Sequence, residues 1–378
     1  MSKKIYITAL HLMHGGIEMA ITSVANALVK RGYDVEILCT YNLGEPAYPL
    51  DCRVRVTYLT DVVPNRKTFV DAVRRKDFPA IIREGIYSAR VLYLKKKVLK
   101  DQFRKIKDGV IISTRNEDSV LLSRCGNHGV KKIAQLHHDH EFDKKLVNDF
   151  VNNYGNIDVF TLLTDELQKE VSEMMKNNHR TKCVVMPNFL PDEECLTVDI
   201  SRQNQAIAVG RLHPVKGFLR LIKLWKPIYE KTGTILKIIG GGDQWDELQK
   251  AIADQGMQDS VILTGPMNHD AVMQEMRKSQ FYAMSSINEG FGFVIIEAMS
   301  QGLPVIAFDV RVGPRYIIKN GESGFLVTEE CESDFVDKAV KLLLDSDERE
   351  RMASLAIERS KYFSEENIMA LWEELLLE

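Results

Sequence analysis

Short apolar runs alternate with amphipathic helical patterns along the first half of the chain. Rich in Ile, Val and Leu, these runs are typical of buried strands. They lie at 5–9, 35–39, 110–113, 132–136 and 159–163. After the first run, apolar residues recur at helical spacing from Ile17 to Leu28. This alternation predicts βα units that build a mostly parallel, doubly wound sheet.

The pattern is interrupted near Met186–Pro191, where two prolines flank an Asn-Phe-Leu segment, and then it begins again. New strand-like runs follow at 206–209, 236–239, 261–264, 281–284 and 305–307, and helical patterns at 334–344, 347–361 and 365–377 close the chain. A chain of 378 residues is too long for one compact core. We therefore predict two similar α/β domains, residues 1–188 and residues 189–364.

Composition narrows the class of protein. With 45% hydrophobic and 27% charged residues, the chain has an ordinary globular composition. No run approaches the roughly 18 to 20 apolar residues of a membrane span, so a soluble protein is expected. The six cysteines are widely scattered and include no C-x-x-C pair, which indicates a reducing, cytoplasmic setting.

The net charge of −3 conceals an uneven distribution along the chain. Residues 1–190 hold 30 Lys and Arg against 22 Asp and Glu, and within 62–108 the numbers are 14 and 5. One interpretation of this basic region is a solvated helix face. Another is a basic amphipathic surface for anionic lipid headgroups, which would place the protein peripherally at the inner face of the plasma membrane. Nucleic acid is not an expected partner.

The stretch from Glu289 to Glu297 carries the first candidate chemistry. A predicted strand ends near Met284, a loop with Gly290 and Gly292 follows, and a helix is expected to begin about Val294. Free amides and the positive end of a helix favour an anion there, and glycine permits close approach of a ligand. Glu289 and Glu297 are close enough in sequence to reach one ligand, where they would hold sugar and ribose hydroxyls.

A second loop, from Gly210 to Gly217, places Arg211 and Lys216 between a strand and a helix. Taken alone, they would be two surface cations. Beside an anion site, they would neutralise the charge that builds on a departing diphosphate, as a metal ion does in other transferases.

The combination of Gly210-Arg211, Lys216 and the Glu289-x7-Glu297 pattern resembles the retaining glycosyltransferases of family 4. The resemblance covers nearly the whole chain and is strongest over residues 206–327. It implies the GT-B fold, in which two Rossmann-like doubly wound domains face each other across a deep cleft and the C-terminal helix, about residues 365–378, joins the first domain. The first domain would bind the acceptor, and the second would bind a nucleotide-sugar donor.

The resemblance also assigns roles to single residues. Arg211 and Lys216 would bind the diphosphate, Glu297 the ribose, and Glu289 the donor sugar. His137, at the end of the run 132–136, would face the donor sugar as a fourth catalytic residue. Further donor-binding positions are implied at Gly15, Gly16, Gly210, Gly241, Gly290, Phe291, Gly292, Phe293 and Val294. The segment Asn320–Val327 matches a structural hairpin of the family.

The cluster His137-His138-Asp139-His140 raises the question of a metal site. Adjacent residues at a strand end point in different directions, and no spaced Cys or His partner is visible. We therefore expect no metal, and the resemblance likewise predicts no cofactor beyond the nucleotide-sugar substrate.

The implied reaction is transfer of a hexose or N-acetylhexosamine from a nucleotide sugar, most commonly a UDP-sugar, to a saccharide acceptor. A lipid-linked acceptor in cell-surface polysaccharide or glycoconjugate synthesis fits the basic region. Two alternatives stay open: a GT-B nucleotide-sugar epimerase and a non-catalytic sugar-nucleotide-binding subunit. A dinucleotide-dependent dehydrogenase is disfavoured, because the turn at His14–Glu18 lacks the G-x-G-x-x-G pattern.

Overall fold

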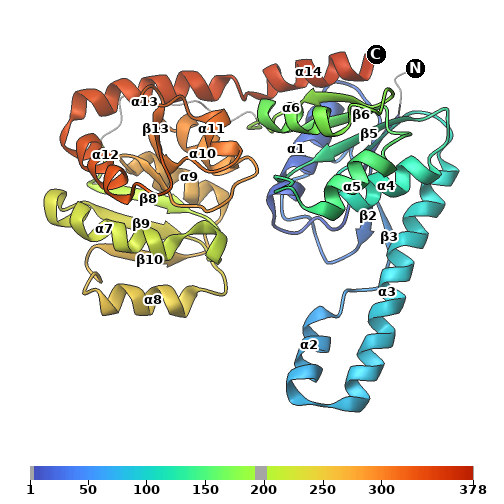
Figure 1. The fold of residues 1–378 in the computed structure, drawn as a ribbon, viewed down its shortest axis with the longest axis horizontal. Helices are drawn as coiled ribbons and strands as arrows, with labels where there is room; N and C mark the ends of the chain where they lie inside the picture. Colours follow the sequence, from blue (N-terminus) through green and yellow to red (C-terminus); the bar gives the residue numbers. More distant parts are fainter. Residues whose placement is uncertain (1–3, 192–201, 378) are drawn as a thin grey trace. The chain divides into compact units, whose positions relative to one another are not determined.

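The computed structural model describes residues 4–191 and 202–377 and divides the chain into two compact units (Figure 1). Unit 1 comprises Met1–Leu162, Leu167–Met186 and Trp372–Glu378, and unit 2 comprises Leu163–Glu166 and Pro187–Leu371. The main division falls between Met186 and Pro187, beside the proline-rich interruption of the sequence pattern.

Unit 1 is built on a seven-stranded sheet in which every neighbouring pair of strands is parallel. Its strands are β1 (Ile5–Ala9), β2 (Val35–Tyr41), β3 (Arg55–Thr60), β4 (Val110–Ser113), β5 (Lys131–Leu136), β6 (Val159–Leu162) and β7 (Lys182–Val185). The order β3-β2-β1-β4-β5-β6-β7 reverses between β1 and β4. In such sheets the carboxyl ends of the strands at the reversal are where ligands bind.

The helices of unit 1 connect these parallel strands, which is the reason that each crossover is long. They are α1 (Gly16–Lys30), α2 (Arg66–Arg75), α3 (Phe78–Lys105), α4 (Asn116–Cys125), α5 (Lys144–Asn153) and α6 (Asp165–Met174), the last beginning in residues assigned to unit 2. Most crossovers use one helix, but the β3-to-β4 crossover contains both α2 and α3, which project from the sheet as a helical hairpin (Figure 1).

Unit 2 repeats the architecture with six parallel strands in the order β10-β9-β8-β11-β12-β13. They are β8 (Gln205–Val209), β9 (Ile235–Ile239), β10 (Val261–Gly265), β11 (Tyr282–Met284), β12 (Val305–Phe308) and β13 (Gly324–Val327). Here the order reverses between β8 and β11, so the loops after these two strands are the expected ligand-binding edge.

The helices of unit 2 cover both faces of its sheet. They are α7 (Phe218–Thr232), α8 (Trp245–Asp254), α9 (His269–Lys278), α10 (Phe293–Ser300), α11 (Gly313–Ile317), α12 (Glu332–Leu344) and α13 (Ser346–Lys361), with a short 3₁₀ helix at Pro214–Lys216. The last helix, α14 (Glu365–Leu377), begins in unit 2 and is assigned to unit 1 from Trp372 onward. Trp225 of α7 stacks on Phe281 with ring centroids 5.9 Å apart, and both rings are fully buried. This aromatic core holds α7, and with it the loop that precedes α7, against the sheet.

The predicted doubly wound fold is confirmed, and two details differ from the sequence-based predictions. Strands β3 and β7 were not predicted because, as partly exposed edge strands, they are less apolar than the central ones. The expected hairpin at Asn320–Val327 is wrong, since β13 pairs with β12 in parallel and is only preceded by a tight turn. The five described cysteines are free of disulfides, and Cys195 lies outside the described residues.

Candidate active site

Two neighbouring loops of unit 2 form the candidate donor site. The backbone N–H of Ile287 donates to the carbonyl of Val215 at 2.8 Å, and the Ser285 hydroxyl donates to the carbonyl of Lys216 at 2.9 Å. Gly217 has φ +65°, and a Cβ there would lie 2.0 Å from the Ser285 oxygen. A glycine is therefore required where the loop after β8 passes the loop after β11.

Lys216 and Glu289 meet at this junction. The Lys216 ammonium donates a hydrogen bond to Oε2 of Glu289, and the two side chains are only 22% and 15% exposed. The loop after β12 fixes the Glu289 backbone, because Val312 and Gly313 donate to the Glu289 carbonyl at 3.1 and 3.0 Å. The two charged residues that the sequence placed 73 positions apart thus form one half-buried ion pair.

The start of α10 lies directly after Glu289. Gly292 takes a left-handed conformation with φ +96° at the N-cap, and no side chain caps the first turn of the helix. A Cβ on Gly292 would come within 2.8 Å of the Ile295 side chain, so both the conformation and the space favour glycine. The amides at this end of α10 remain available to an anion.

The two phenylalanines of the loop have different surroundings. Phe291 is buried and packs edge-on against Phe293 and Phe363, with centroids 5.9 and 5.7 Å away. Its ring therefore supports the loop from inside unit 2. Phe293 and Val294, the first two residues of α10, are only partly buried, as is Gly290.

Glu297 lies one turn into α10 and is 5% exposed. Its Oε1 atom is 3.9 Å from Nδ1 of His269. Burial raises the pKa of the Tyr282 hydroxyl, and the negative charges of Glu289 and Glu297 raise it further. Both carboxylates therefore act electrostatically on the same buried hydroxyl, which donates to the Val209 carbonyl at 3.1 Å.

Arg211 belongs to the same strand-end loop as Lys216, but its side chain is exposed and has no ion-pair or hydrogen-bond partner within residues 4–191 and 202–377. The structure thus brings Lys216 and Glu289 into contact and leaves the Arg211 guanidinium available for a ligand.

The glycine turn after β9 packs against the same loop. A Cβ on Gly240 would lie 1.9 Å from the Gly210 oxygen, and one on Gly242 would lie 2.4 Å from the Leu212 oxygen. A Cβ on Gly241 would make only ordinary contact with Pro266, at 3.6 Å. Gly241 was the predicted donor-binding residue, whereas the close backbone approach falls on Gly240 and Gly242 on either side of it.

His137 follows β5 in unit 1, and both of its ring nitrogens are buried without a hydrogen-bond partner. Burial, reinforced by the charges of His138 and Arg115, lowers the pKa of His137 to about 3. The imidazole is therefore neutral near pH 7, so it has one N–H donor and one acceptor nitrogen for an uncharged polar group.

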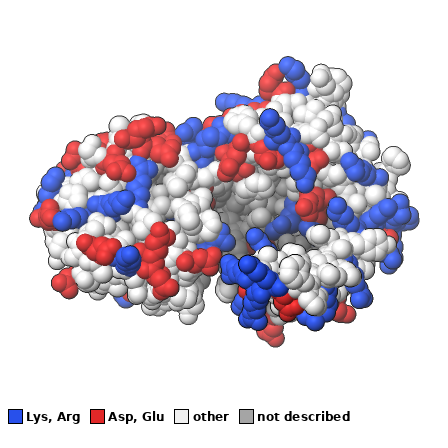
Figure 2. Space-filling model, turned by 60° about the horizontal axis from the view of Figure 1, so that its bottom comes forward, with Lys and Arg blue, Asp and Glu red and all other residues white. Residues whose placement is uncertain are grey.

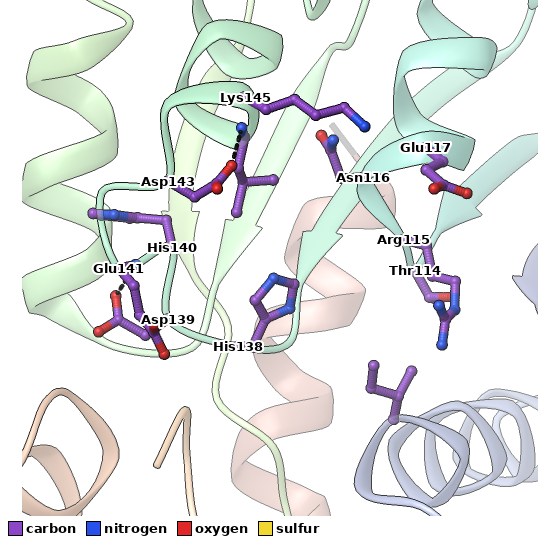
Figure 3. Close-up of a pocket in the computed structure, with 12 residues that line it drawn as sticks. Thr114, Arg115, Asn116, Glu117, His138, Asp139, His140, Glu141, Asp143 and Lys145 are labelled. Carbon is purple, nitrogen blue, oxygen red and sulfur yellow. Dashed lines mark hydrogen bonds between the residues drawn. The ribbon is translucent and has the colours of Figure 1, made fainter. Parts of the chain in front are cut away.

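A cavity of about 440 Å³ opens beside this strand end (Figure 3). The start of α4 contributes Asn116 and Glu117, and the loop after β5 contributes Asp139, while His138 projects between them (Figure 3). Its remaining lining residues are Ile17, Thr114, Arg115, His140, Glu141, Asp143, Lys145 and Leu146. Carboxylates, amides and cations in one cavity are suited to a ligand with many hydroxyl groups.

The third histidine of the cluster, His140, contacts neighbouring groups of the protein through both ring nitrogens. His140 is buried, its Nδ1 accepts from the Phe142 amide at 3.0 Å, and its Nε2 lies 2.9 Å from Oε2 of Glu170. Within the described residues, no three His, Cys, Asp or Glu side chains come together as a metal site would require.

Gly15 and Gly16 stand at the start of α1, but they have an acidic neighbour that the sequence analysis missed. A Cβ on Gly15 would lie 2.1 Å from Oε2 of Glu18, a buried residue whose Oε1 is 3.5 Å from Nδ1 of His11. A carboxylate beside this loop repels phosphate and favours hydroxyl groups. The available signal was Glu18 in the first helical turn behind two glycines.

The two doubly wound units, each with a switch-point edge at the end of a parallel sheet, have the GT-B fold of glycosyltransferases. Residues 198–359 match the family described as "Glycosyl transferases group 1". The predicted resemblance to glycosyltransferases is thereby confirmed.

Individual relatives agree with this assignment. The amylovoran biosynthesis glycosyltransferase AmsD of Erwinia amylovora is 29% identical over 372 residues, which cover 96% of each chain. The crystal structure of TarM, from S. aureus, matches with a TM-score of 0.78 at 15% identity and covers 100% of this chain and 99% of its own. The pneumococcal O-GlcNAc transferase GtfA, in complex with UDP and GlcNAc, matches with a TM-score of 0.75 at 15% identity, covering 99% of this chain and 98% of its own. At these identities, the structural matches establish the fold.

Proposed function

We propose that the protein is a retaining, metal-independent glycosyltransferase of family 4. It transfers a hexose or N-acetylhexosamine from a UDP-sugar to a saccharide acceptor in the synthesis of a cell-surface polysaccharide or glycoconjugate. The observation that carries this proposal is the Lys216–Glu289 ion pair beside the uncapped start of α10. It combines a cation, a carboxylate and free amides at one switch point, which are the groups that a sugar diphosphate needs.

The donor would exchange its own groups for those of the ion pair. A diphosphate attracts the Lys216 ammonium, the free Arg211 guanidinium and the amides of Gly292 and Phe293, while sugar hydroxyls donate to Glu289. These cations stabilise the negative charge that develops on the diphosphate as the glycosidic bond breaks. Glu297, buried deeper along α10, is positioned to accept from the ribose hydroxyls.

Retention of the anomeric configuration requires the acceptor to attack the sugar face that the diphosphate leaves. In this proposal the departing phosphate oxygen accepts the proton of the acceptor hydroxyl, so no separate general base is needed. The neutral His137 then contributes a hydrogen bond to the donor sugar without competing for that proton.

The names and ligands of the relatives support the substrate class. AmsD is named for the biosynthesis of amylovoran, and GtfA was crystallised with UDP and GlcNAc. The polar cavity of unit 1 offers carboxylates and amides for a saccharide acceptor. We propose that this acceptor is lipid-linked and that the enzyme works in the cytoplasm at the inner membrane surface.

The donor is identified by thermal-shift measurements with UDP-, GDP- and ADP-sugars in the presence of EDTA. A ligand that binds only the folded state raises the melting temperature, and we expect the largest rise with one UDP-hexose or UDP-N-acetylhexosamine. The radiolabelled donor is then incubated with membrane lipid extracts, and the anomeric configuration of the product is read by NMR.

Each outcome has a consequence for the proposal. Transfer to lipid with retained configuration and no added metal supports it. An epimer formed from the donor alone identifies an epimerase instead, and donor binding without any transfer identifies a non-catalytic subunit. A strict requirement for a divalent metal ion contradicts the role given to Arg211 and Lys216.

A further inference from the structure

The helical hairpin of α2 and α3 projects from unit 1 (Figure 1). The second half of α3 is anchored in the unit through the buried Leu99 and Phe103, whereas α2 contains only one buried residue, Ala72. Asn65 clasps the hairpin, because its Nδ2 donates to the Glu84 carbonyl at 3.0 Å and its Oδ1 accepts from the Ser88 hydroxyl at 2.7 Å. The projecting part of the hairpin is therefore held together by hydrogen bonds and buries few apolar side chains.

An apolar stripe runs along the outer face of α3. Phe78, Ile82, Ile86 and Tyr93 make up this stripe, with exposed fractions of 72%, 65%, 68% and 64%. Their spacings of four, four and seven residues place the side chains on one face of the helix. Large apolar residues that follow one another on an exposed helix face indicate an interaction surface, whereas single exposed ones are ordinary.

Cations surround the apolar stripe. Arg74, Arg75 and Lys76 stand at the turn between the helices, and all three are exposed. Arg83 and Arg90 flank the stripe, and the exposed Lys96 and Lys97 follow it toward the anchored end of α3. Figure 2 turns this end of the molecule toward the viewer and shows lysine and arginine side chains gathered beside uncharged ones.

We propose that the hairpin docks unit 1 on an anionic lipid bilayer. The apolar stripe enters the boundary between headgroups and acyl chains, while the surrounding cations bind lipid phosphates. Apolar groups beside Lys and Arg on one helix are the pattern of helices that lie in a membrane interface. A nucleic acid would leave the stripe in water, and a second copy of the chain would bring the same cations against one another. Within the described residues, no helix has the length and apolar character to span a membrane.

Docking would also position the polar cavity of unit 1. Lys95 of α3 reaches α4, where its ammonium lies 2.5 Å from Oε2 of Glu117, a residue that lines the cavity. The same helix thus carries the apolar stripe and, two residues after Tyr93, a contact to the cavity wall. A bilayer held by α3 would keep the cavity at a fixed position relative to the headgroups, where the saccharide of a lipid-linked acceptor lies. This last step rests on the proposed acceptor, whereas docking itself does not.

The test measures flotation of the full chain with phosphatidylcholine vesicles that contain phosphatidylglycerol and with vesicles of phosphatidylcholine alone. We expect binding to the anionic vesicles that weakens as salt is added. The double variant Ile82→Ser/Ile86→Ser and the double variant Arg74→Glu/Arg75→Glu should each weaken binding about tenfold or more. The matched control is Leu344→Ser in unit 2, where the leucine is 68% exposed and should be irrelevant to binding.

Insertion is measured separately from surface attraction. In a Phe78→Trp variant, acyl-chain-brominated lipids should quench the new tryptophan, whereas they should leave the matched Leu344→Trp variant unquenched. Melting temperature and its rise with the UDP-sugar show that each variant is folded and binds donor, so a failure of docking is distinguishable from a failure of the proposed function. Equal binding to neutral and anionic vesicles, unchanged binding by both double variants, or a dimer that the Ile82→Ser/Ile86→Ser change dissociates would each overturn the proposal.

Discussion

The two units solve the same topological step with very different amounts of chain. In unit 2 the crossover from the edge strand β10 back to the central strand β11 uses α9, which has 10 residues. In unit 1 the equivalent crossover from β3 to β4 uses α2 and α3, which have 10 and 28 residues. One short helix is therefore enough for this crossover in unit 2. The sheet of unit 1 does not explain the additional helical residues of its crossover.

At the carboxyl ends of the strands, the two units have the same order reversal in their sheets but carry different functional side chains. Unit 2 places a charged pair, Lys216 and Glu289, at its switch point. Unit 1 places His137, which burial keeps neutral, beside a cavity of mixed polarity. The charged strand-end edge of unit 2 and the neutral edge of unit 1 agree with the proposal that the two units bind substrates of different charge. The longer crossover of unit 1 agrees with the proposal that only unit 1 docks on a bilayer.

The largest expected effect comes from removing the cation at the edge of unit 2. In the proposed reaction, Lys216→Ala leaves the charge of the departing diphosphate less neutralised, and the variant should lower kcat about 10²- to 10³-fold. Turnover with a radiolabelled UDP-sugar and a lipid-extract acceptor measures this loss.

The matched control is Lys223→Ala, which removes an exposed lysine from α7, the helix behind the same loop. It should retain full turnover. Equal turnover of Lys216→Ala and Lys223→Ala would contradict the chemical difference between the two strand-end edges, because Lys216 would then have no special role at the edge of unit 2.

A smaller effect is expected from the second carboxylate. Glu297→Gln keeps the size of a buried side chain but removes the charge that we propose accepts from ribose hydroxyls, so UDP affinity should fall about tenfold. Isothermal titration with UDP measures the affinity. Unchanged affinity for UDP together with weaker binding of the intact UDP-sugar would move Glu297 from the ribose to the sugar.

The neutral His137 of unit 1 should make the free energy of unfolding depend on pH. The folded-state pKa of His137 is about 3, below its ordinary value of 6.5, so the unfolded chain takes up this proton first as the pH falls. His137 therefore costs stability below pH 6.5, by up to about 1.4 kcal/mol for each pH unit. His137→Gln, which does not titrate, should flatten the decline in unfolding free energy between pH 6 and pH 4 in urea titrations.

The control for this experiment is His128→Gln, which replaces an exposed histidine of the same unit. It should preserve the wild-type decline. An equal decline in wild type and His137→Gln would show that His137 is accessible to protons, which contradicts a neutral, buried edge.

The smallest effect concerns Asp118, which follows the hairpin in α4. Burial raises the pKa of Asp118 from 3.8 to about 6, although the Lys95 charge and the Thr8 hydroxyl oppose the rise. The folded state therefore binds a proton between these values, and the ionised carboxylate costs stability above pH 6. Asp118→Asn should gain on the order of 1 kcal/mol at pH 8 relative to its effect at pH 4.

Unfolding titrations at the two pH values check this prediction, with the exposed Asp108→Asn as the control. A gain that is equal at both pH values would show that packing, and not charge, decides the effect. It would also remove the role of Lys95 as an electrostatic link between the hairpin and α4.

The sequence was most informative where periodicity and burial coincide. The central strands β1, β4 and β8 and the start of α10 were predicted to within a residue, because long apolar runs and a glycine loop mark them. The edge strands β3 and β7 are partly exposed and carry a weaker pattern. Their pairing depends on neighbours that are distant in sequence, which local patterns do not record.

The candidate site was predicted unevenly for a related reason. Loops that leave adjacent parallel strands must meet, so the sequence indicated that Lys216 and Glu289 share an edge. It did not reveal that they pair with each other, or that Tyr282 lies near both carboxylates. Glu18 was missed because one acidic residue in a first helical turn is common, and only its position at Gly15 distinguishes it.

The clasp at Asn65 has a practical consequence for engineering. Asn65 joins the two helices of the projecting part by hydrogen bonds to Glu84 and Ser88, while the second half of α3 is anchored in unit 1. Grafting the hairpin onto the short crossover of a related scaffold would test whether the proposed membrane docking is separable from glycosyl transfer.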